Sequence, residues 1–273
     1  MTKNNSFKKQ IRSRMALTGE TYAQAREALC VEHIPLKELL EAGLVLPSKD
    51  PKNRRLEDIF TPSELRDLKK SLVQRETVIV AGGAGTGKTA VLNTILNTYG
   101  VESRKPHGIE SRTISIEENI CELDVVEGDH FQLLTRDTTS VEALLPNVMR
   151  MRPDAVAVGE IRINEMWMLH RLVGMGTGSF GTLHCRTMTQ LAEYWDFEEI
   201  RATTVVMMEK LMVAGRKFYL YAVIPLTGEV IAAMKQYRMD YDEVNFYKTL
   251  GTLGVEPVES KELRIRNMLS KQG

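Results

Sequence analysis

The sequence predicts an α/β fold with a mainly parallel central sheet. Short apolar runs rich in β-branched residues alternate with helical patterns between residues 77 and 235. One such run, at 77–81, leads into a glycine-rich turn and then into an amphipathic pattern at 88–99 that Gly100 is expected to end. A strand without polar alternation is typical of a sheet covered on both faces, so we expect the strands nearest this turn to be parallel.

Strand patterns occur in seven segments, at 77–81, 113–116, 130–135, 155–159, 181–185, 218–224 and 229–234. Helix signals lie before and after them. Thr61, Pro62 and Glu64 have the spacing of a capped helix start, and 260–273 has the pattern of a surface helix. Methionines at 166, 168, 175, 207, 208 and 212 are interpreted as core or subunit-interface packing.

The composition is that of an ordinary water-soluble protein. The 273 residues carry 36 Lys and Arg against 36 Asp and Glu, so the balance does not indicate a nucleic-acid or anionic-membrane partner. Cys30, Cys121 and Cys185 are far apart, which argues against zinc or a disulfide framework and fits a reducing cytosol. We expect neither a signal peptide nor a membrane-spanning segment, so that any membrane association is peripheral.

The chain is predicted to have four parts. Residues 1–46 read as a short helical region, 47–56 as a linker, 57–235 as the α/β domain and 236–273 as a helical tail. In the first part, Thr21 and Gln24 form a capping-box pattern, while Pro35 and Gly43 mark a helix start and stop. Residues 1–14 hold five basic side chains and no acid, which indicates a solvated helix face or, alternatively, a contact with nucleic acid or anionic lipid.

Residues 82–89 (GGAGTGKT) match the phosphate-binding loop G-x-x-x-x-G-K-[ST]. Glycines allow the backbone to wrap the phosphates of ATP, and the following helix directs its positive end at them. Lys88 is expected at the β- and γ-phosphates and Thr89 on Mg²⁺. The predicted nucleotide-binding residues are Gly83, Ala84, Gly85, Thr86, Gly87, Lys88, Thr89 and Ala90.

A second acidic site is predicted where the apolar run 155–159 ends at Glu160. A carboxylate at the end of such a strand can polarise water against a γ-phosphate, and it can also hold Mg²⁺ directly or through water. Taken alone, Glu160 fits a solvated strand end equally well.

The segment MRMRPDAVAVGEIR, at 149–162, resembles the Walker B region of the secretion or traffic ATPases, in which the glutamate is the catalytic acid. Further motifs follow the family order across roughly 57–225. Residues 113–125 (TISIEENICELDV) are similar to the acidic box, with Glu117 and Glu118 as its acidic pair and Glu122 in its later Glu-Leu. HFQLLTR, ending at Arg136, and the histidine box at 176–185, with His184, complete the resemblance.

The resemblance implies a RecA-like P-loop ATPase domain at 57–235 that powers secretion, conjugation or pilus assembly. It implies a ring of copies, expected to be a hexamer, which is cytoplasmic and works against inner-membrane secretion or pilus platform proteins. Glu117 or Glu118 would assist the metal or the water, and His184 would sense the γ-phosphate unless it is simply a core histidine. The arginines that could stabilise phosphate charge, in part across a subunit boundary, are Arg136, Arg150, Arg152 and Arg162.

Two departures from the family pattern keep other functions open. Gly176 stands where the family usually has the first histidine of its histidine box, and the N-terminal region is shorter than the usual N-terminal domain. One alternative is therefore a nucleotide-binding scaffold with little turnover. Another is a nucleic-acid-directed P-loop motor that uses the basic N-terminal helix as its contact.

Overall fold

The computed structural model describes residues 3–25, 36–48, 54–102, 112–118, 121–125, 128–135, 140–162, 166–195, 202–213 and 216–271. The chain forms two compact units. The sheet unit holds residues 48–209 and 221–258, and the terminal unit holds 1–47, 210–220 and 259–273. The part boundaries predicted at residues 46, 56 and 235 stay predictions.

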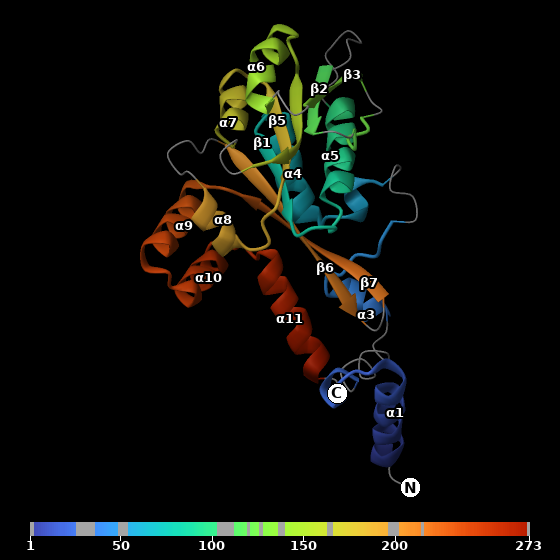
Figure 1. Cartoon of the computed structure of the whole chain (residues 1–273). Coiled ribbons are helices and arrows are strands. Elements are labelled where there is room, and N and C mark those ends of the chain that lie inside the picture. Colours follow the sequence, from blue (N-terminus) through green and yellow to red (C-terminus); the bar gives the residue numbers. More distant parts are fainter. Residues whose placement is uncertain are drawn as a thin grey trace. The chain divides into compact units, whose positions relative to one another are not determined.

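The described residues form a seven-stranded sheet in the order β3-β2-β4-β5-β1-β6-β7 (Figure 1). The strands are β1 (Thr77–Gly82), β2 (Arg112–Glu118), β3 (Asp129–Thr135), β4 (Ala155–Ile161), β5 (Gly178–Leu183), β6 (Thr203–Val213) and β7 (Arg216–Pro225). All recorded pairs from β3 to β6 are parallel, which confirms the predicted mainly parallel sheet. Every residue of β1 and of β5 is buried, as expected of strands covered on both faces.

Helices cover both faces of this sheet. The sheet unit contains the 3₁₀ turn η1 (Leu56–Asp58) and the helices α4 (Pro62–Val73), α5 (Lys88–Glu102), α6 (Val141–Arg150), α7 (Met166–Gly174), α8 (Met188–Tyr194), α9 (Gly228–Asp240) and α10 (Glu243–Thr252). The crossover from β1 to β2 runs one way across the sheet, and those from β3 to β4 and from β4 to β5 run the other way. Right-handed crossovers then place α5 on one face and α6 and α7 on the other, as Figure 1 shows.

Local signals explain several helix limits. The hydroxyl of Thr61 accepts from the backbone N–H of Glu64, whose side chain accepts from the backbone N–H of Thr61, so the predicted capped start of α4 is confirmed. The predicted stop at Gly100 is wrong, because α5 continues to Glu102. One glycine evidently costs too little to break a helix that packs along the sheet.

Two sheet assignments differ from the sequence prediction. Residues 229–234, predicted as a strand, belong to helix α9, which the side chain of Thr227 caps and which buries Val230, Ala233 and Met234. The apolar run at 230–234 is short enough to fit a helix and a strand equally well, and the cap at Thr227 makes it a helix. Strand β6 was not predicted, although Met207 and Met208 are buried in it beside β1, in agreement with their interpretation as core residues.

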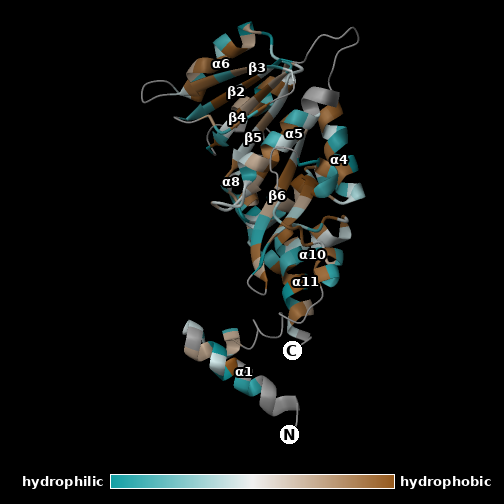
Figure 2. Ribbon diagram, turned by 90° about the vertical axis from the view of Figure 1, so that its right-hand side faces the viewer, coloured by the Kyte–Doolittle hydropathy of each residue, from teal (hydrophilic) through white to brown (hydrophobic). Residues whose placement is uncertain are grey.

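The terminal unit contains α1 (Lys3–Thr18), α3 (Leu36–Glu41) and most of α11 (Val258–Lys271), the predicted C-terminal helix. The capping box of Thr21 and Gln24 is confirmed, and Gly43 follows α3 with φ at +96°, as a helix stop requires. Pro35 and residues 49–53 of the predicted linker lie outside the described residues. Hydrophobic residues lie along the strands and on parts of the helices (Figure 2), and none of the described helices is long and apolar enough to span a bilayer.

Candidate active site

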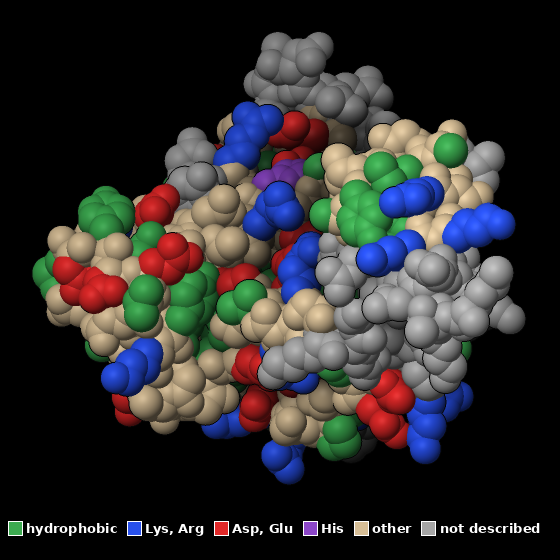
Figure 3. Space-filling model, turned by 90° about the horizontal axis from the view of Figure 1, so that it is seen from below, with side chains coloured by type: hydrophobic (Ala, Val, Ile, Leu, Met, Phe, Trp, Pro, Cys, Tyr) green, Lys and Arg blue, Asp and Glu red, His purple; other side chains and the backbone are tan. Residues whose placement is uncertain are grey.

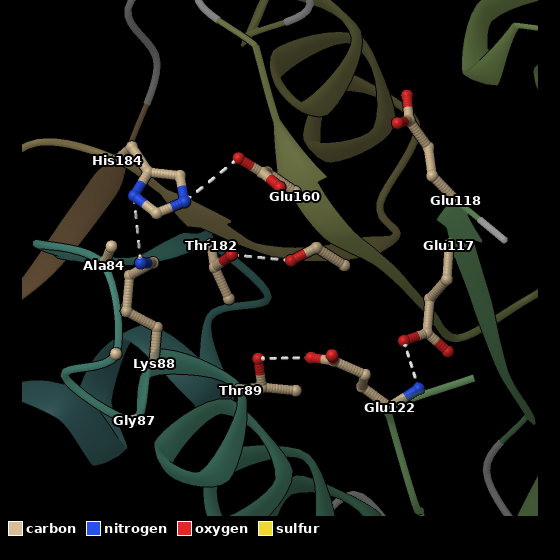
Figure 4. A pocket seen from close by; sticks show the side chains of 12 residues that line it. Ala84, Gly87, Lys88, Thr89, Glu117, Glu118, Glu122, Glu160, Thr182 and His184 are labelled. Carbon is tan, nitrogen blue, oxygen red and sulfur yellow. Dashed lines mark hydrogen bonds and ion pairs between the residues drawn. The ribbon is translucent and has the colours of Figure 1, made fainter. Parts of the chain in front are cut away.

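A cavity of about 520 Å³ lies at the carboxyl ends of the central strands, beside the first turn of α5. Its walls come from the carboxyl ends of β2, β4 and β5, the loop at 121–125 and the glycine-rich loop (Figure 4). Its lining residues are Ala84, Gly85, Gly87, Lys88, Thr89, Glu117, Glu118, Glu122, Gly159, Glu160, Thr182 and His184. The carboxyl end of an open parallel sheet is the usual place for a ligand, and this end gathers the loop, the strand-end glutamate and the histidine that the sequence singled out.

The glycine-rich loop has the backbone that phosphate binding needs. Gly85 and Gly87 have φ of +67° and +92°, a conformation that favours glycine. A methyl group on Gly82 would lie 2.7 Å from the carbonyl oxygen of Met208, so the loop leaves the sheet through a gap that only glycine fits. The hydroxyl of Thr86 donates to the carbonyl of Gly83 at 2.9 Å and closes the loop. The N-terminus of α5 therefore faces the cavity, where it can bind an anion.

Lys88, His184 and Glu160 form a chain of polar contacts across the cavity (Figure 4). The ammonium of Lys88 donates to the carbonyl of Gly83 at 3.1 Å and lies 3.3 Å from Nδ1 of His184. On the other side of the ring, Nε2 of His184 lies 3.1 Å from Oε1 of Glu160. Burial lowers the pKa of Lys88, and the charge of Glu160 acts in the opposite direction. The histidine thus connects the phosphate-binding lysine with the predicted catalytic acid.

Glu122 contacts Thr89 and was not among the predicted site residues. The hydroxyl of Thr89 donates to Oε2 of Glu122 at 3.1 Å. Side chains of α5 hold the backbone around Glu122: Asn93 donates to its carbonyl at 3.1 Å and accepts from the N–H of Asp124 at 2.9 Å. The sequence signal for Glu122 is its place in the later Glu-Leu of the acidic box, and it is less conspicuous than the adjacent acidic pair at 117–118.

Glu117 supports this loop rather than facing the cavity with both oxygens. It is buried, and its Oε1 accepts from the backbone N–H groups of Glu122 and Leu123 at 2.7 and 2.9 Å. Burial raises its pKa, and the two backbone hydrogen bonds act against that rise. A methyl group on Gly159 would lie 2.9 Å from Cγ of Glu117, so the Gly-Glu end of β4 makes room for this carboxylate.

The other predicted residues lie at the edge of the site or outside it. Glu118 is exposed and accepts two hydrogen bonds from Nη2 of Arg162, at 2.9 and 3.1 Å. Arg150 and Arg152 are exposed and do not belong to the cavity lining. Arg136 lies outside the described residues. The structure therefore brings Arg162 next to the acidic box and leaves the role of the remaining arginines as a prediction.

The glycine at 176 has a structural reason. It adopts φ of +78° after α7, and its carbonyl accepts a hydrogen bond from Arg75 at 3.1 Å. A histidine would be strained in this left-handed turn. The departure from the family pattern therefore lies in a turn before β5, whereas His184 lies in the cavity lining after β5.

The site suits a magnesium ion that arrives with a nucleotide. Among the described residues, no group of three or more His, Cys, Asp or Glu side chains is arranged to hold a metal by itself. The cavity does offer the Thr89 hydroxyl together with the carboxylates of Glu122 and Glu160. Mg²⁺ is commonly held by one or two protein oxygens, substrate phosphates and water, and this donor set fits that pattern.

Solved structures share the fold. The pilus retraction motor PilT with bound ADP matches with a TM-score of 0.54 at 15% identity, covering 89% of this chain and 80% of that one. The Legionella pneumophila ATPase DotB matches with a TM-score of 0.50 at 17% identity, covering 78% of this chain and 66% of that one. Both neighbours support the α/β architecture described above.

Curated relatives match part of the chain. The probable conjugal transfer protein TrbB of Sinorhizobium fredii is 28% identical over 132 residues, which are 48% of this chain and 39% of that protein. Protein VirB11 of Agrobacterium fabrum is 32% identical over 120 residues, which are 41% of this chain and 32% of that protein. A family model described as "Type II/IV secretion system protein" matches residues 23–192, more than half of the chain. The chain therefore belongs to the type II/IV secretion system protein family.

Proposed function

We propose that this protein is an ATP-hydrolysing motor of the type II/IV secretion kind. The observation that carries the proposal is the cavity itself. It places the phosphate-binding loop, the strand-end Glu160, the Thr89–Glu122 pair and His184 around one space large enough for a triphosphate. A P-loop alone indicates only nucleotide binding. A carboxylate opposite it adds a group that can activate water.

The nucleotide is held by the loop and by the first turn of α5. Backbone N–H groups of 83–89 face the phosphates, and Lys88 turns its ammonium from Gly83 and His184 to the β- and γ-phosphates. Thr89 and Glu122 are the residues that would hold Mg²⁺, with Glu160 as a further oxygen ligand, directly or through water. When bound, Mg²⁺ neutralises charge that develops on the phosphates.

Hydrolysis requires water on the far side of the γ-phosphate. Glu160 faces the cavity from the end of β4 and accepts a proton from that water. His184 contacts both Glu160 and Lys88, so a γ-phosphate that draws Lys88 away also changes the surroundings of the catalytic acid. His184 is therefore the residue through which the site registers whether a γ-phosphate is present.

The working form is a ring of copies, a hexamer, at the cytoplasmic side of an inner-membrane secretion or pilus platform. The names of the relatives support this setting, since they are conjugal transfer, VirB11 and pilus retraction proteins. In such a ring, an arginine of this chain can complete the site of the next copy, and Arg136, Arg150, Arg152 and Arg162 are the candidates. One arginine across a boundary can change the rate by about 10³–10⁵.

Two measurements on the purified chain test the proposal. Phosphate release from Mg²⁺–ATP should be catalytic for the wild type and lost in Lys88→Ala, which should also bind nucleotide far more weakly. Light scattering should show a larger assembly when nucleotide is added. A chain that binds ATP without turnover would instead be a scaffold. Turnover stimulated by DNA or RNA, with a steep salt dependence, would favour a nucleic-acid motor.

A further inference from the structure

Arg186 lies against the beginning of the phosphate-binding loop, although no motif points to it. A methyl group on Gly83 would lie 3.4 Å from Cδ and 3.5 Å from Nε of this arginine. Its backbone is fixed, because its N–H donates to the side chain of Gln190 at 2.9 Å and Thr187 caps the next helix, α8. The arginine is thus placed beside the loop by the same turn that places His184, two residues earlier.

The guanidinium of Arg186 is held loosely. Its Nε and Nη2 both donate to one oxygen, Oε2 of Glu209, each at 3.3 Å. Its side chain is 64% exposed, whereas that of Glu209 is 12% exposed. Two long bonds to a single oxygen use two of the five N–H donors of a guanidinium. An anion with several oxygens would satisfy the group better than Glu209 does.

The cavity lining carries more acidic than basic side chains, so a bound triphosphate would need a further cation. Four carboxylates line the cavity, at Glu117, Glu118, Glu122 and Glu160, against one lysine, Lys88. Arg162 pairs with Glu118 at the edge of the cavity. A triphosphate adds several negative charges to a site that already has an excess of them. Each cation beside the loop therefore contributes to the binding of the triphosphate. Figure 3 shows one face of the molecule, on which basic and acidic side chains are interspersed.

We propose that Arg186 is a nucleotide-binding residue that exchanges its ion pair with Glu209 for one with the terminal phosphate of a bound nucleoside triphosphate. The terminal phosphate is favoured because Gly83, on which Arg186 lies, also accepts from the ammonium of Lys88, the group that pairs with the β- and γ-phosphates. The inference rests on the proposed nucleotide site.

The exchange has a structural consequence for strand β6. Glu209 is the last residue of the sheet unit in that strand, and Lys210–Val213 continue it within the terminal unit. Loss of the arginine from Glu209 would therefore change the charge on β6 at the point where the strand passes from one unit to the other. Glu209 therefore competes with the terminal phosphate for Arg186. Substitutions of Arg186 and of Glu209 should change the affinity for a nucleoside triphosphate in opposite directions.

The test compares Arg186→Gln with Glu209→Gln in the full-length protein, using fluorescence titration with labelled ATPγS and labelled ADP in Mg²⁺ buffer. Arg186→Gln should bind ATPγS about tenfold more weakly, as expected for a lost charge-assisted hydrogen bond, and ADP nearly as the wild type does. Glu209→Gln should bind ATPγS more tightly than the wild type. Arg266→Gln, which breaks an exposed Arg–Glu pair on α11, should change neither affinity.

A different set of results would show that the Arg186–Glu209 ion pair only supports the phosphate-binding loop. If both substitutions weaken ATPγS and ADP to the same degree, the ion pair merely supports the loop and the proposal is overturned. Arg186→Lys keeps the charge and should recover part of the ATPγS affinity. If the guanidinium had only a structural role, the lysine variant would not recover this affinity. Unchanged binding in Lys88→Ala would instead refute the nucleotide site, so the two failures are distinguishable.

Discussion

The hydroxyl of Thr89 donates to the carboxylate of Glu122 at 3.1 Å, and this contact connects the first turn of α5 with the acidic loop at 121–125. The loop has no secondary structure of its own. It is held by side chains of neighbouring elements, among them Gln132 of β3, which donates to the carbonyl of Leu123 at 2.6 Å. Such support indicates that the position of Glu122 is specified by the fold.

Glu122→Gln should raise the Mg²⁺ concentration needed for tight nucleotide binding by about tenfold, since one carboxylate near the ion is lost. Binding of ADP in EDTA should be unchanged. Titration of labelled ADP with Mg²⁺ measures both quantities. Glu118→Gln is the matched control, and an equal shift in that variant would contradict the assignment of Glu122.

Glu117→Ala should loosen the acidic loop, because two backbone N–H groups lose their acceptor. We expect a loss of about 1–3 kcal/mol in the free energy of unfolding and a weaker response to Mg²⁺. Glu117→Gln keeps an acceptor oxygen and should retain most of both. Gly159→Ala, which forces a methyl group against Glu117, should resemble Glu117→Ala. Chemical denaturation and Mg²⁺ titration distinguish these outcomes; equal stability of the Ala and Gln variants would rule out the supporting role.

His184→Ala should separate the response to ATP from the response to ADP. The substitution removes the contacts to Lys88 and Glu160, so the γ-phosphate no longer acts on the catalytic acid through the ring. We expect kcat to fall by about 10²-fold, with ADP affinity near that of the wild type. Stopped-flow ATP hydrolysis with parallel ADP titration checks this. The side chain of His184 is 50% exposed, so the alternative of a core histidine is wrong, and normal kcat would show that the ring has no part in hydrolysis.

Stability should fall at mildly acidic pH in part through His130. Burial lowers its pKa, and Asp124 and the Val125 backbone act in the opposite direction. A histidine with a lowered folded-state pKa favours folding when neutral, so its contribution is fully present above the unfolded pKa of about 6.5 and is lost as pH falls from that value through the lower folded-state pKa. Urea midpoints at pH 7.5 and 5.5 should differ less for His130→Gln than for the wild type. An equal difference would assign the acid sensitivity to other groups.

The parts of the site that local sequence defines were predictable. The loop at 82–89 lies between a strand and a helix within one continuous segment, and Glu160 is the next-to-last residue of β4. Both therefore carry their signal in neighbouring residues. His184 directly follows β5, so its signal also lies in neighbouring residues. The mainly parallel sheet followed from buried strands that alternate with helices.

The parts that depend on contacts between distant segments were not predictable. Glu117 could not be recognised as a support, because Gly159 reaches it only when β2 and β4 pair. The contacts of Glu122 and of Arg186 likewise form only in the folded chain. The sequence pattern does not predict β6, whose apolar run is interrupted by Glu209 and Lys210. It predicts a strand within α9, because the apolar run itself carries no sign of the cap at Thr227.

The central claim is that Glu160 activates water for ATP hydrolysis in this cavity. The measurement that tests it most directly is steady-state phosphate release by Glu160→Gln, made beside a titration of the same preparation with labelled ATPγS. The account predicts nucleotide binding close to that of the wild type and turnover lowered by at least about 10²-fold. Turnover at the wild-type rate in a variant that binds ATPγS normally would contradict the account.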